Sequence, residues 1–352
     1  MKCLADREHV RIAGRTTTVG DILYLGFSGS FIEFETKAAQ VRVTFCTDEE
    51  VPEATYRGWA AVLVDDGKEP VRRLALAGPK QTMTVFSEKT ARKVKLRIVK
   101  MSEAAFGLVG IQEIETESDA PVIPTQPLER RIEFIGDSIT CGYGNEGVLD
   151  RDVFCTEQEN PLDAYAILTA DALQAEYQLV SWSGIGIITN WVPETAEEPA
   201  HEIWMPELFP YRDRRLCEKL GLPLEEWDAS EFMPDLVVIH LGTNDDSYVR
   251  NKRDREEYFG QEFYAFLQHV HENRPGAAIL CALGVMGQNL CDEEKRQVER
   301  FKQAHPEVRA DFVTLPQQKE EDGIGADSHP SKVTHRKTAA ILTEKIREFM
   351  SW

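Results

Sequence analysis

The chain has 352 residues, of which 42% are hydrophobic and 28% charged, and its formal net charge is −20. This balance excludes a disordered or fibrous protein, and the length is sufficient for two domains that each bury a core. So strong a negative charge repels phosphate backbones and anionic lipid surfaces, so nucleic acid and membranes are poor candidate partners and a neutral substrate fits better.

The first third of the chain alternates short apolar strands with turn residues. The strands predicted there are residues 31–34, 41–45, 61–64, 84–86 and 94–98. This pattern is typical of an all-β sandwich, which we assign to residues 1–120.

A polar, proline-rich stretch follows the predicted sandwich. It contains Pro121, Pro124 and Pro127. Such a change of composition is typical of a domain boundary, so we predict a linker at residues 121–129 and a second domain over residues 130–352.

After the linker, apolar strand-like runs alternate with longer helical segments. The predicted strands are residues 131–135, 177–182, 236–241, 277–283 and 311–315. Two of the helices each show one apolar face, formed by Phe259, Phe263, Phe266 and Val270 in one case and by Leu342, Ile346 and Phe349 in the other. The alternation predicts an α/β domain with a parallel sheet covered on both faces.

Ser138 follows the first predicted strand of this sheet. Gly136 permits a tight exit from the strand, and the next turn can present both the serine hydroxyl and its backbone N–H to one reacting carbon. Open α/β sheets bind their ligands at this edge. A serine in this position can equally be an ordinary helix cap, so the segment alone does not identify a nucleophile.

Three further segments fall at predicted strand ends or in the last loop. They are Ser183-Gly184-Ile185-Gly186, Gly242-Thr243-Asn244-Asp245 and Asp327-Ser328-His329-Pro330. With Ser138 they resemble the four blocks of the SGNH (GDSL) hydrolase superfamily, which supply a serine, a glycine, an asparagine and a histidine in this order. The matching residues are Ser138, Gly184, Asn244 and His329.

Acyl transfer needs residues of these types. It requires a nucleophile, a base that takes the proton of the nucleophile, and donors aimed at the developing oxyanion. Ser138 is the candidate nucleophile and His329 its base. The backbone N–H groups of Ser138 and Gly184 and the side-chain amide of Asn244 are the candidate oxyanion donors.

The third member of a catalytic triad is not settled by the sequence. Many SGNH enzymes carry an aspartate three residues before the histidine, where this chain has Ala326, and Asp327 lies two residues before it. Asp327 could complete a triad, or a backbone carbonyl could orient His329 in a Ser–His dyad. Both arrangements stay open at this point.

A longer run around the nucleophile resembles a narrower family. Residues 136–145 (GDSITCGYGN) are similar to carbohydrate esterase family 2. The resemblance extends over nearly the whole chain and implies a jelly-roll-like sandwich followed by an SGNH domain of flavodoxin-like sheet order. It also implies deacetylation of plant polysaccharides or their oligosaccharides, such as mannan, xylan or glucan, often at the 6-hydroxyl. Some members of the family use a Ser–His dyad.

Four aromatic residues gather around and after the Gly184 block. They are Trp182, Trp191, Trp204 and Tyr211. Indole faces stack on the apolar C–H faces of sugars, although core or loop packing is the commoner role for each. Trp191 is the first candidate for substrate binding, because it lies in a loop beyond the second predicted strand of the α/β domain.

The other reactive side chains are expected to have structural roles. Asp137 and Asp245 are suited to bonding local backbone, and Cys141 to packing as a buried thiol. His269 and His271 stand two positions apart and so do not share a helical face that would hold a metal. We expect no metal and no organic cofactor.

The expected function is a serine acetylesterase that acts on carbohydrate. One alternative is a lysophospholipase or thioesterase of the same superfamily, which would need an apolar channel for its acyl chain. An alternative of another class is a carbohydrate-binding protein whose second domain has lost activity. Whether the sandwich binds sugar or shapes the cleft stays open, as does the oligomeric state.

The N-terminus and the cysteines bear on the compartment. Residues 1–10 lack the apolar core of a secretory signal, and no stretch approaches a membrane span. Seven cysteines without a CxxC pair indicate reduced thiols rather than a disulfide framework. We expect a cytoplasmic protein, or a secreted one if its leader is not part of this sequence.

Overall fold

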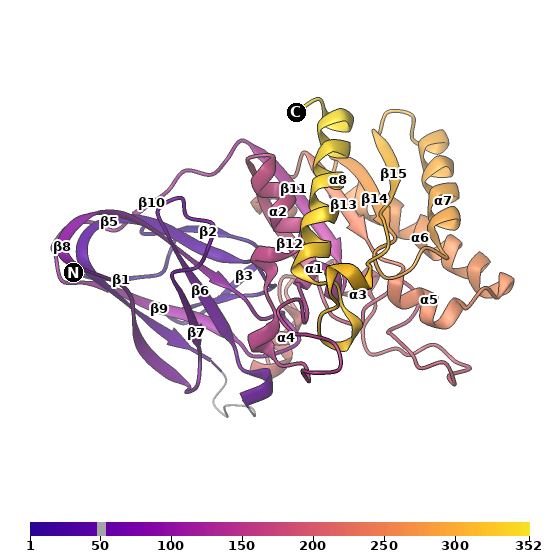
Figure 1. The fold of residues 1–352 in the computed structure, drawn as a ribbon. Helices are drawn as coiled ribbons and strands as arrows, with labels where there is room; N and C mark the ends of the chain where they lie inside the picture. The colour runs from indigo at the N-terminus through magenta and orange to yellow at the C-terminus, as the bar shows by residue number, and fades with distance from the viewer. Residues whose placement is uncertain (48–53) are drawn as a thin grey trace. The chain divides into compact units, whose positions relative to one another are not determined.

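Figure 1 shows the fold of the chain in a computed structural model, which describes residues 1–47 and 54–352. The described residues form two compact units. The first unit contains residues 1–127, 154–162 and 212–225, and the second contains residues 128–153, 163–211 and 226–352. Two short segments that the sequence prediction assigned to the second domain therefore pack with the first unit.

These two segments are held in the first unit by hydrogen bonds and apolar contacts. Thr156 is buried, and its hydroxyl donates to the backbone oxygen of Arg57 (2.8 Å). Leu216, from the other segment, packs in a small apolar cluster with Tyr24 and Leu108. Both segments lie in long connections of the α/β half, where the sequence pattern carries no sign of the strands that they contact.

The first unit is an antiparallel β-sandwich, as predicted, with strand order β3-β4-β9-β5-β8-β6-β7. β1 pairs with β9, and β2 and β10 pair with β5. The strands are β1 (Lys2–Leu4), β2 (Arg11–Ala13), β3 (Thr16–Val19), β4 (Ile22–Leu25), β5 (Phe31–Cys46), β6 (Trp59–Val64), β7 (Arg72–Ala75), β8 (Lys80–Lys100), β9 (Val109–Thr116) and β10 (Ile123–Pro124). Side chains such as Phe34, Val43 and Ile98 form its apolar core.

β5 and β8 are much longer than the strands predicted from the sequence. Each runs through two predicted strands, 31–34 and 41–45 in β5, and 84–86 and 94–98 in β8. The two strands pair along their length with shifts of register near Ala38 and Val41, and bulges of this kind bend a strand without ending it. Residues 87–93, in the middle of β8, are mostly polar and mostly exposed, so the apolar alternation stops there although the strand continues.

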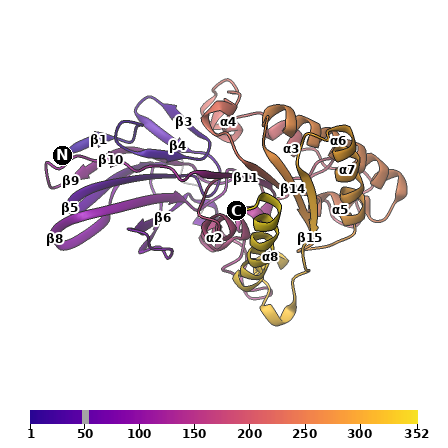
Figure 2. The same cartoon turned by 90° about the horizontal axis from the view of Figure 1, so that it is seen from above.

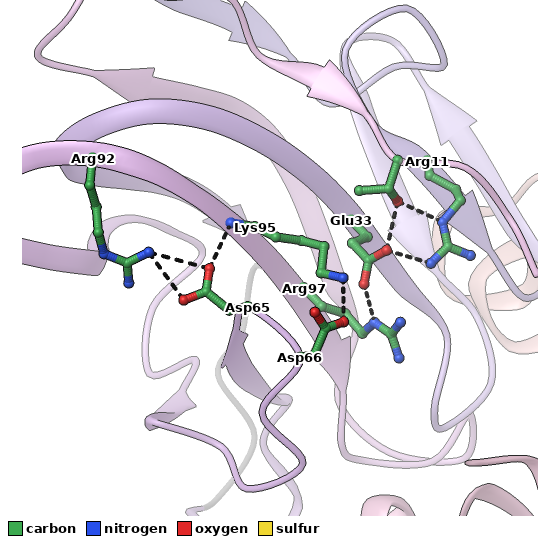
Figure 3. Close-up of polar contacts among 8 residues, drawn as sticks. Arg11, Glu33, Asp65, Asp66, Arg92, Lys95 and Arg97 are labelled. Carbon is green, nitrogen blue, oxygen red and sulfur yellow. Dashed lines mark hydrogen bonds and ion pairs between the residues drawn. The ribbon is translucent and has the colours of Figure 1, made fainter. Parts of the chain in front are cut away.

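A buried glutamate joins β5 to two neighbouring strands. Glu33 lies opposite Arg11 of β2 and Arg97 of β8, and its carboxylate binds each guanidinium at 2.6 Å (Figure 3). Burial opposes the charge of Glu33, but the two arginines outweigh it and its pKa is lowered to about 2. Thr125 donates to the same carboxylate (2.6 Å), and β10 pairs with β5. Part of the predicted linker is therefore built into the sandwich.

The second unit contains a five-stranded parallel sheet in the order β12-β11-β13-β14-β15. This is the flavodoxin-like order that the family resemblance implied. Its strands are β11 (Arg130–Gly136), β12 (Ala175–Ser181), β13 (Leu236–His240), β14 (Ala278–Leu283) and β15 (Ala310–Thr314). Each overlaps a predicted strand, because strands covered on both faces appear in the sequence as continuous apolar runs.

Helices cover both faces of this sheet. α2 packs against α8 on one face, and α6 against α7 on the other (Figure 2). The helices of the second unit are α1 (Ser138–Cys141), α2 (Tyr165–Ala172), α3 (Met205–Leu208), α5 (Thr243–Val249), α6 (Arg253–Asn273), α7 (Cys291–Ala304) and α8 (Lys332–Met350), whereas α4 (Arg214–Leu220) belongs to the first unit. The predicted apolar faces of α6 and α8 are buried, except that Phe349 is only partly covered.

Short 3-10 turns complete the described structure. They occupy Ala54–Tyr56, Thr156–Gln158, Pro161–Asp163, Ala229–Glu231, Glu320–Asp322 and Ala326–Ser328. Among the described residues, every helix is too short or too polar to span a lipid bilayer.

Candidate active site

The sequence blocks emerge together at the carboxyl edge of the parallel sheet. Gly136 at the end of β11 pairs with Ser181 at the end of β12 and with His240 at the end of β13. The three segments that follow these strand ends therefore leave the sheet at one level. The predicted site residues that they carry are Ser138, Gly184 and Asn244.

Ser138 is the first residue of the short helix α1. The side chain of Asp137 caps this helix by accepting a hydrogen bond from the N–H of Ile139 (2.9 Å). A Cβ at Gly136 would collide with a side chain of α1, so this glycine lets the strand turn directly into the helix. Ser138 is 6% exposed, which leaves its hydroxyl in a largely water-excluded position.

His329 reaches Ser138 across 191 positions of the chain. Its Nε2 lies 2.8 Å from the Oγ of Ser138. The loop that carries His329 lies against the loop after α1, where the N–H of Ala326 donates to the backbone oxygen of Gly144 (3.0 Å). A Cβ at either Gly144 or Gly325 would collide with backbone of the opposite loop. Two facing glycines therefore allow the approach that brings the histidine to the serine.

Asp327 meets His329 with its backbone and not with its carboxylate. The Nδ1 of the ring lies 3.1 Å from the backbone oxygen of Asp327, which can only accept, so Nδ1 carries the proton and Nε2 accepts from Ser138. The carboxylate accepts a hydrogen bond from the hydroxyl of Tyr143 (2.9 Å). Asp327 and Ser328 have φ of 50° and 64°, a left-handed turn that directs the carbonyl at the imidazole. Of the two arrangements left open above, this is the geometry of the dyad.

The Asp327→Asn variant is expected to lower kcat for an acetyl ester by less than about tenfold, because a carbonyl in the same backbone position still orients His329. An aspartate that acted as a third triad member would cost about 10⁴-fold when changed to asparagine. The asparagine oxygen can also accept from Tyr143, which preserves the loop. The measurement is kcat of Asp327→Asn beside that of His329→Ala, and equal losses would contradict the dyad.

The ionisation of His329 suits a general base. Burial lowers the pKa of the imidazole from the usual 6.5 to about 4, and the backbone of Asp327 and Ala326 and the charge of Asp327 oppose this only in part. The neutral ring is the form that takes a proton from serine. A lowered pKa therefore keeps the base in its working form down to acidic pH.

The pH profile of kcat/KM is expected to stay level from about pH 8 to about pH 5 and to fall by half near the pKa of about 4. The rate falls toward acidic pH because protonation of His329 removes the lone pair that accepts the serine proton. The measurement is the rate of hydrolysis of a soluble acetyl ester in a constant-ionic-strength buffer. Asp245→Asn is the control, since the pKa of buried Asp245 is raised to about 6. A half-maximal rate near pH 6.5 that persists in this variant would contradict the prediction.

The candidate oxyanion donors lie on three different loops. The side-chain N–H groups of Asn244 are directed at the backbone oxygen of Ile185 (2.8 Å) and, at a longer 3.4 Å, at the carboxylate of Asp137. Asn244 thus contacts the residues next to both other donors. In the described part of the chain, the backbone N–H groups of Ser138 and Gly184 donate to no protein acceptor. These groups are available to an oxyanion formed at Ser138.

Gly184 is required for its backbone conformation. Its φ is 76°, in the left-handed region that glycine adopts without strain. No described atom beyond its chain neighbours lies within 4 Å of the position that a Cβ would take. The space beside Gly184 is therefore open.

Asp245 anchors the loop of Gly184 to α5. It is fully buried, and its carboxylate accepts from the N–H groups of Ile187 (2.9 Å) and Ile188 (2.8 Å). A Cβ at Gly186 would collide with this carboxylate, so the glycine permits the contact. Asp245 therefore binds backbone, as expected from the sequence, but the backbone belongs to a distant segment of the chain and is not local.

Trp191 lies at the surface directly after this loop. It is 61% exposed, and its backbone N–H donates to the backbone oxygen of Gly184 (2.9 Å). Trp182, Trp204 and Tyr211 are only partly exposed, and the indole of Trp204 is tied to a backbone oxygen (2.9 Å). Of the four aromatic candidates, Trp191 therefore presents the most accessible ring.

The sequence reasoning missed the residues that hold His329. The ring of Tyr143 packs against the imidazole with 4.4 Å between centroids, and Gly144 and Gly325 set the distance between the two loops. The sequence contains one part of the pattern that could have identified them, because two glycines flank Tyr143 directly after the nucleophile block. Nothing in the sequence indicates that this tyrosine faces a histidine almost two hundred residues away.

Comparison with known families gives one match to the N-terminal part of the chain and another to the C-terminal part. Residues 134–337 match the GDSL-like lipase/acylhydrolase family. Residues 12–125 match the carbohydrate esterase 2 N-terminal family. The first match contains every residue of the candidate site described above.

Individual proteins are similar over nearly the whole chain. The cellulase/esterase CelE of Acetivibrio thermocellus is 32% identical over 330 residues, which are 93% of this chain and 38% of CelE. An acetylxylan esterase/glucomannan deacetylase of Cellvibrio japonicus is 27% identical over 352 residues, 99% of this chain and 91% of that protein. A solved family two carbohydrate esterase from Clostridium thermocellum, in complex with cellohexaose, has a TM-score of 0.84 at 29% identity and covers 97% of this chain and 99% of its own. This chain thus spans well under two thirds of the length of CelE.

Proposed function

Because the chain belongs to the GDSL-like lipase/acylhydrolase family and carries a carbohydrate esterase 2 N-terminal domain, we propose that it is a serine esterase that removes acetyl groups from carbohydrate. The proposed substrates are acetylated oligosaccharides of mannan, xylan or glucan, with the acetyl group on the 6-hydroxyl. The observation that carries the proposal is the 2.8 Å contact between Ser138 Oγ and His329 Nε2, beside the backbone N–H groups of Ser138 and Gly184, which donate to no protein acceptor among the described residues.

The reaction begins with proton transfer from Ser138 to His329. As Nε2 takes the proton, Oγ forms a bond to the acetyl carbonyl carbon, and the carbonyl oxygen becomes an oxyanion. The N–H groups of Ser138 and Gly184 and the amide of Asn244 stabilise that charge. His329 then gives its proton to the sugar oxygen, the ester bond breaks, and an acetyl group remains on Ser138.

A water molecule completes the cycle. Neutral His329 takes a proton from the water, whose oxygen attacks the acetyl carbon and regenerates the oxyanion at the same donors. Collapse of this intermediate releases acetate and returns the proton to Ser138. The backbone oxygen of Asp327 accepts from Nδ1 in both half-reactions, so Nε2 of the same ring takes and returns the proton each time.

Two observations support a carbohydrate substrate. The solved relative from Clostridium thermocellum is a family two carbohydrate esterase in complex with cellohexaose, and the Cellvibrio japonicus relative is named an acetylxylan esterase/glucomannan deacetylase. Independently, the exposed ring of Trp191 follows the loop of Gly184 and offers a face for a sugar ring.

The experiment that tests the function is acetate release from acetylated mannan and xylan oligosaccharides, followed by NMR at each acetyl position. Wild type should release acetate with a preference for the 6-hydroxyl, and Ser138→Ala should release none above background. Acetyl and octanoyl model esters should be compared in parallel. A clear octanoyl preference would favour the lipid esterase or thioesterase, and glycan binding without any release would favour the inactive binding protein.

Trp191→Ala is expected to raise KM for an acetylated oligosaccharide about tenfold, since one aromatic stacking contact contributes about 1.4 kcal/mol. The kcat, and the KM for p-nitrophenyl acetate, should be unchanged, because the small ester has no sugar ring to stack. Trp191→Phe keeps an aromatic face and should recover part of the affinity. An unchanged oligosaccharide KM in Trp191→Ala would remove this residue from the site.

A further inference from the structure

Three side chains with metal-binding atoms converge at the end of the sheet opposite Ser138. His271 lies in the last turn of α6, His305 directly follows α7, and Glu307 lies in the loop before β15. All three belong to the second unit. The cluster lies near the start of β15, whereas Ser138 follows the end of β11. The cluster is therefore separate from the proposed active site.

The possible ligand atoms of these side chains lie close to one another. The Oε1 of Glu307 lies 3.6 Å from the Nδ1 of His305 and 4.0 Å from the Nε2 of His271, and one ligand atom from each residue lies within 4.8 Å of the others. Direct hydrogen bonds between nitrogen and oxygen measure roughly 2.7–3.2 Å, so neither contact is one. Ligands around a tetrahedral zinc ion, with bonds of about 2.0–2.2 Å, are separated by about 3.3 Å, which small side-chain rotations would reach here.

The two imidazoles are held by an apolar neighbour. Their ring centroids are 5.2 Å apart, and both rings pack against Phe301, at 4.6 Å for His305 and 5.9 Å for His271. Both histidines are partly buried, since the exposed fraction of the side chain is 26% for His305 and 23% for His271. The carboxylate of Glu307 reaches solvent. Packing against Phe301 limits the positions of the rings before any ion binds, which reduces the entropy cost of binding.

Two of the three side chains border a cavity, whereas His305 is not among the residues that line it. His271 and Glu307 line a cavity of 620 Å³, together with Asp235 and Arg309 among others. Three protein ligands and an open side are typical of metal sites that retain a bound water, in contrast to the closed four-ligand structural sites. Two imidazoles and one carboxylate suit Zn²⁺ or Ni²⁺, whereas Mg²⁺ and Ca²⁺ prefer oxygen ligands throughout.

We propose that His271, His305 and Glu307 form a transition-metal site that binds one Zn²⁺ ion with three protein ligands and water. The ion would tie the end of α6 to the segment between α7 and β15. From the sequence, His271 was paired only with His269, and these two residues do not share a helical face. The partners found here come from segments more than thirty residues further along the chain, which only the fold brings near. The proposal does not depend on the proposed esterase activity.

The test is isothermal titration of ZnCl₂ into the full chain, first treated with EDTA and dialysed into a non-coordinating buffer. Wild type should bind one equivalent, and Zn²⁺ should raise its melting temperature by about 5 °C at saturating concentration. MgCl₂ should give no heat of binding. His305→Gln and Glu307→Gln should each weaken Zn²⁺ binding by about 100-fold or more and lose the shift in melting temperature.

The matched control is His201→Ala, which removes another surface histidine paired with a glutamate (2.7 Å to Glu207) and should leave Zn²⁺ binding unchanged. Glu307 is exposed, so its variant keeps the proposal testable even if His305→Gln fails to fold. Absence of saturable Zn²⁺ binding in wild type would overturn the proposal. Binding of equal affinity in Glu307→Gln and wild type would do the same, because the ion would then sit elsewhere.

Discussion

Replacing Ser138 by alanine is expected to lower kcat for acetate release by roughly 10⁵- to 10⁶-fold, to the residual level left by substrate binding and oxyanion donors alone. The change removes the attacking oxygen and little else. The α1 helix is capped by Asp137 and not by the serine hydroxyl, so the backbone N–H of residue 138 keeps its position. The measurement is acetate release under saturating substrate, with a thermal melt to show that the variant is folded.

His329→Ala provides the matched variant for this prediction. It should reduce kcat by nearly as much as Ser138→Ala, because each residue is ineffective without the other across the 2.8 Å contact. For the same reason, the double variant should be no slower than either single variant. Additive losses, or a Ser138→Ala enzyme within a hundredfold of wild type, would show that another nucleophile performs the reaction.

Removal of the Asn244 side chain should lower kcat by about 10²- to 10³-fold while KM changes little. The amide acts on charge that exists only after Ser138 has attacked, so its loss raises the barrier without weakening substrate binding. Asn244→Ala is the direct test, measured as kcat and KM on one acetylated oligosaccharide. A fall of less than tenfold would remove Asn244 from the oxyanion site.

The structure shows why stability must be measured on the same variant. Asn244 is buried and donates to the backbone oxygen of Ile185, which would lose this partner. An unpaired buried acceptor costs about 1–3 kcal/mol of unfolding free energy. Asn244→Asp is the informative companion, since it keeps the size of the side chain but presents a carboxylate to the oxyanion. If kcat falls at least as far in Asn244→Asp as in Asn244→Ala, the loss comes from the charge presented to the oxyanion and not from the size of the side chain.

The sequence predicted the parallel sheet well because its signal is local. Strands buried on both faces appear in the sequence as continuous apolar runs, and all five predicted runs are strands of the sheet. The sandwich was harder to predict, because β5 and β8 continue through bulges and polar stretches where the alternation of apolar residues breaks down. The two segments that joined the first unit, 154–162 and 212–225, carry no pattern of their own.

The candidate site was predictable only as far as side chains determine it. Residue type and order were enough to predict Ser138, Gly184, Asn244 and His329 as site residues, and the fold brings them to one edge of the sheet. The choice between triad and dyad depended on backbone angles at Asp327, which residue type does not reveal. The facing glycines at 144 and 325 and the stacking of Tyr143 depend on contacts between distant loops, which no single-sequence pattern records.

The orientation of His329 by a main-chain oxygen determines which substitutions near it the chain can accept. Every amino acid at position 327 has the same backbone carbonyl. A substitution there therefore keeps the oxygen that lies beside the Nδ1 of His329. What selection must preserve is the left-handed turn through 327 and 328, which proline cannot adopt and β-branched residues adopt only with strain. Part of the proposed catalytic site thus depends on backbone conformation, and a search for catalytic residues by side chain will not find it.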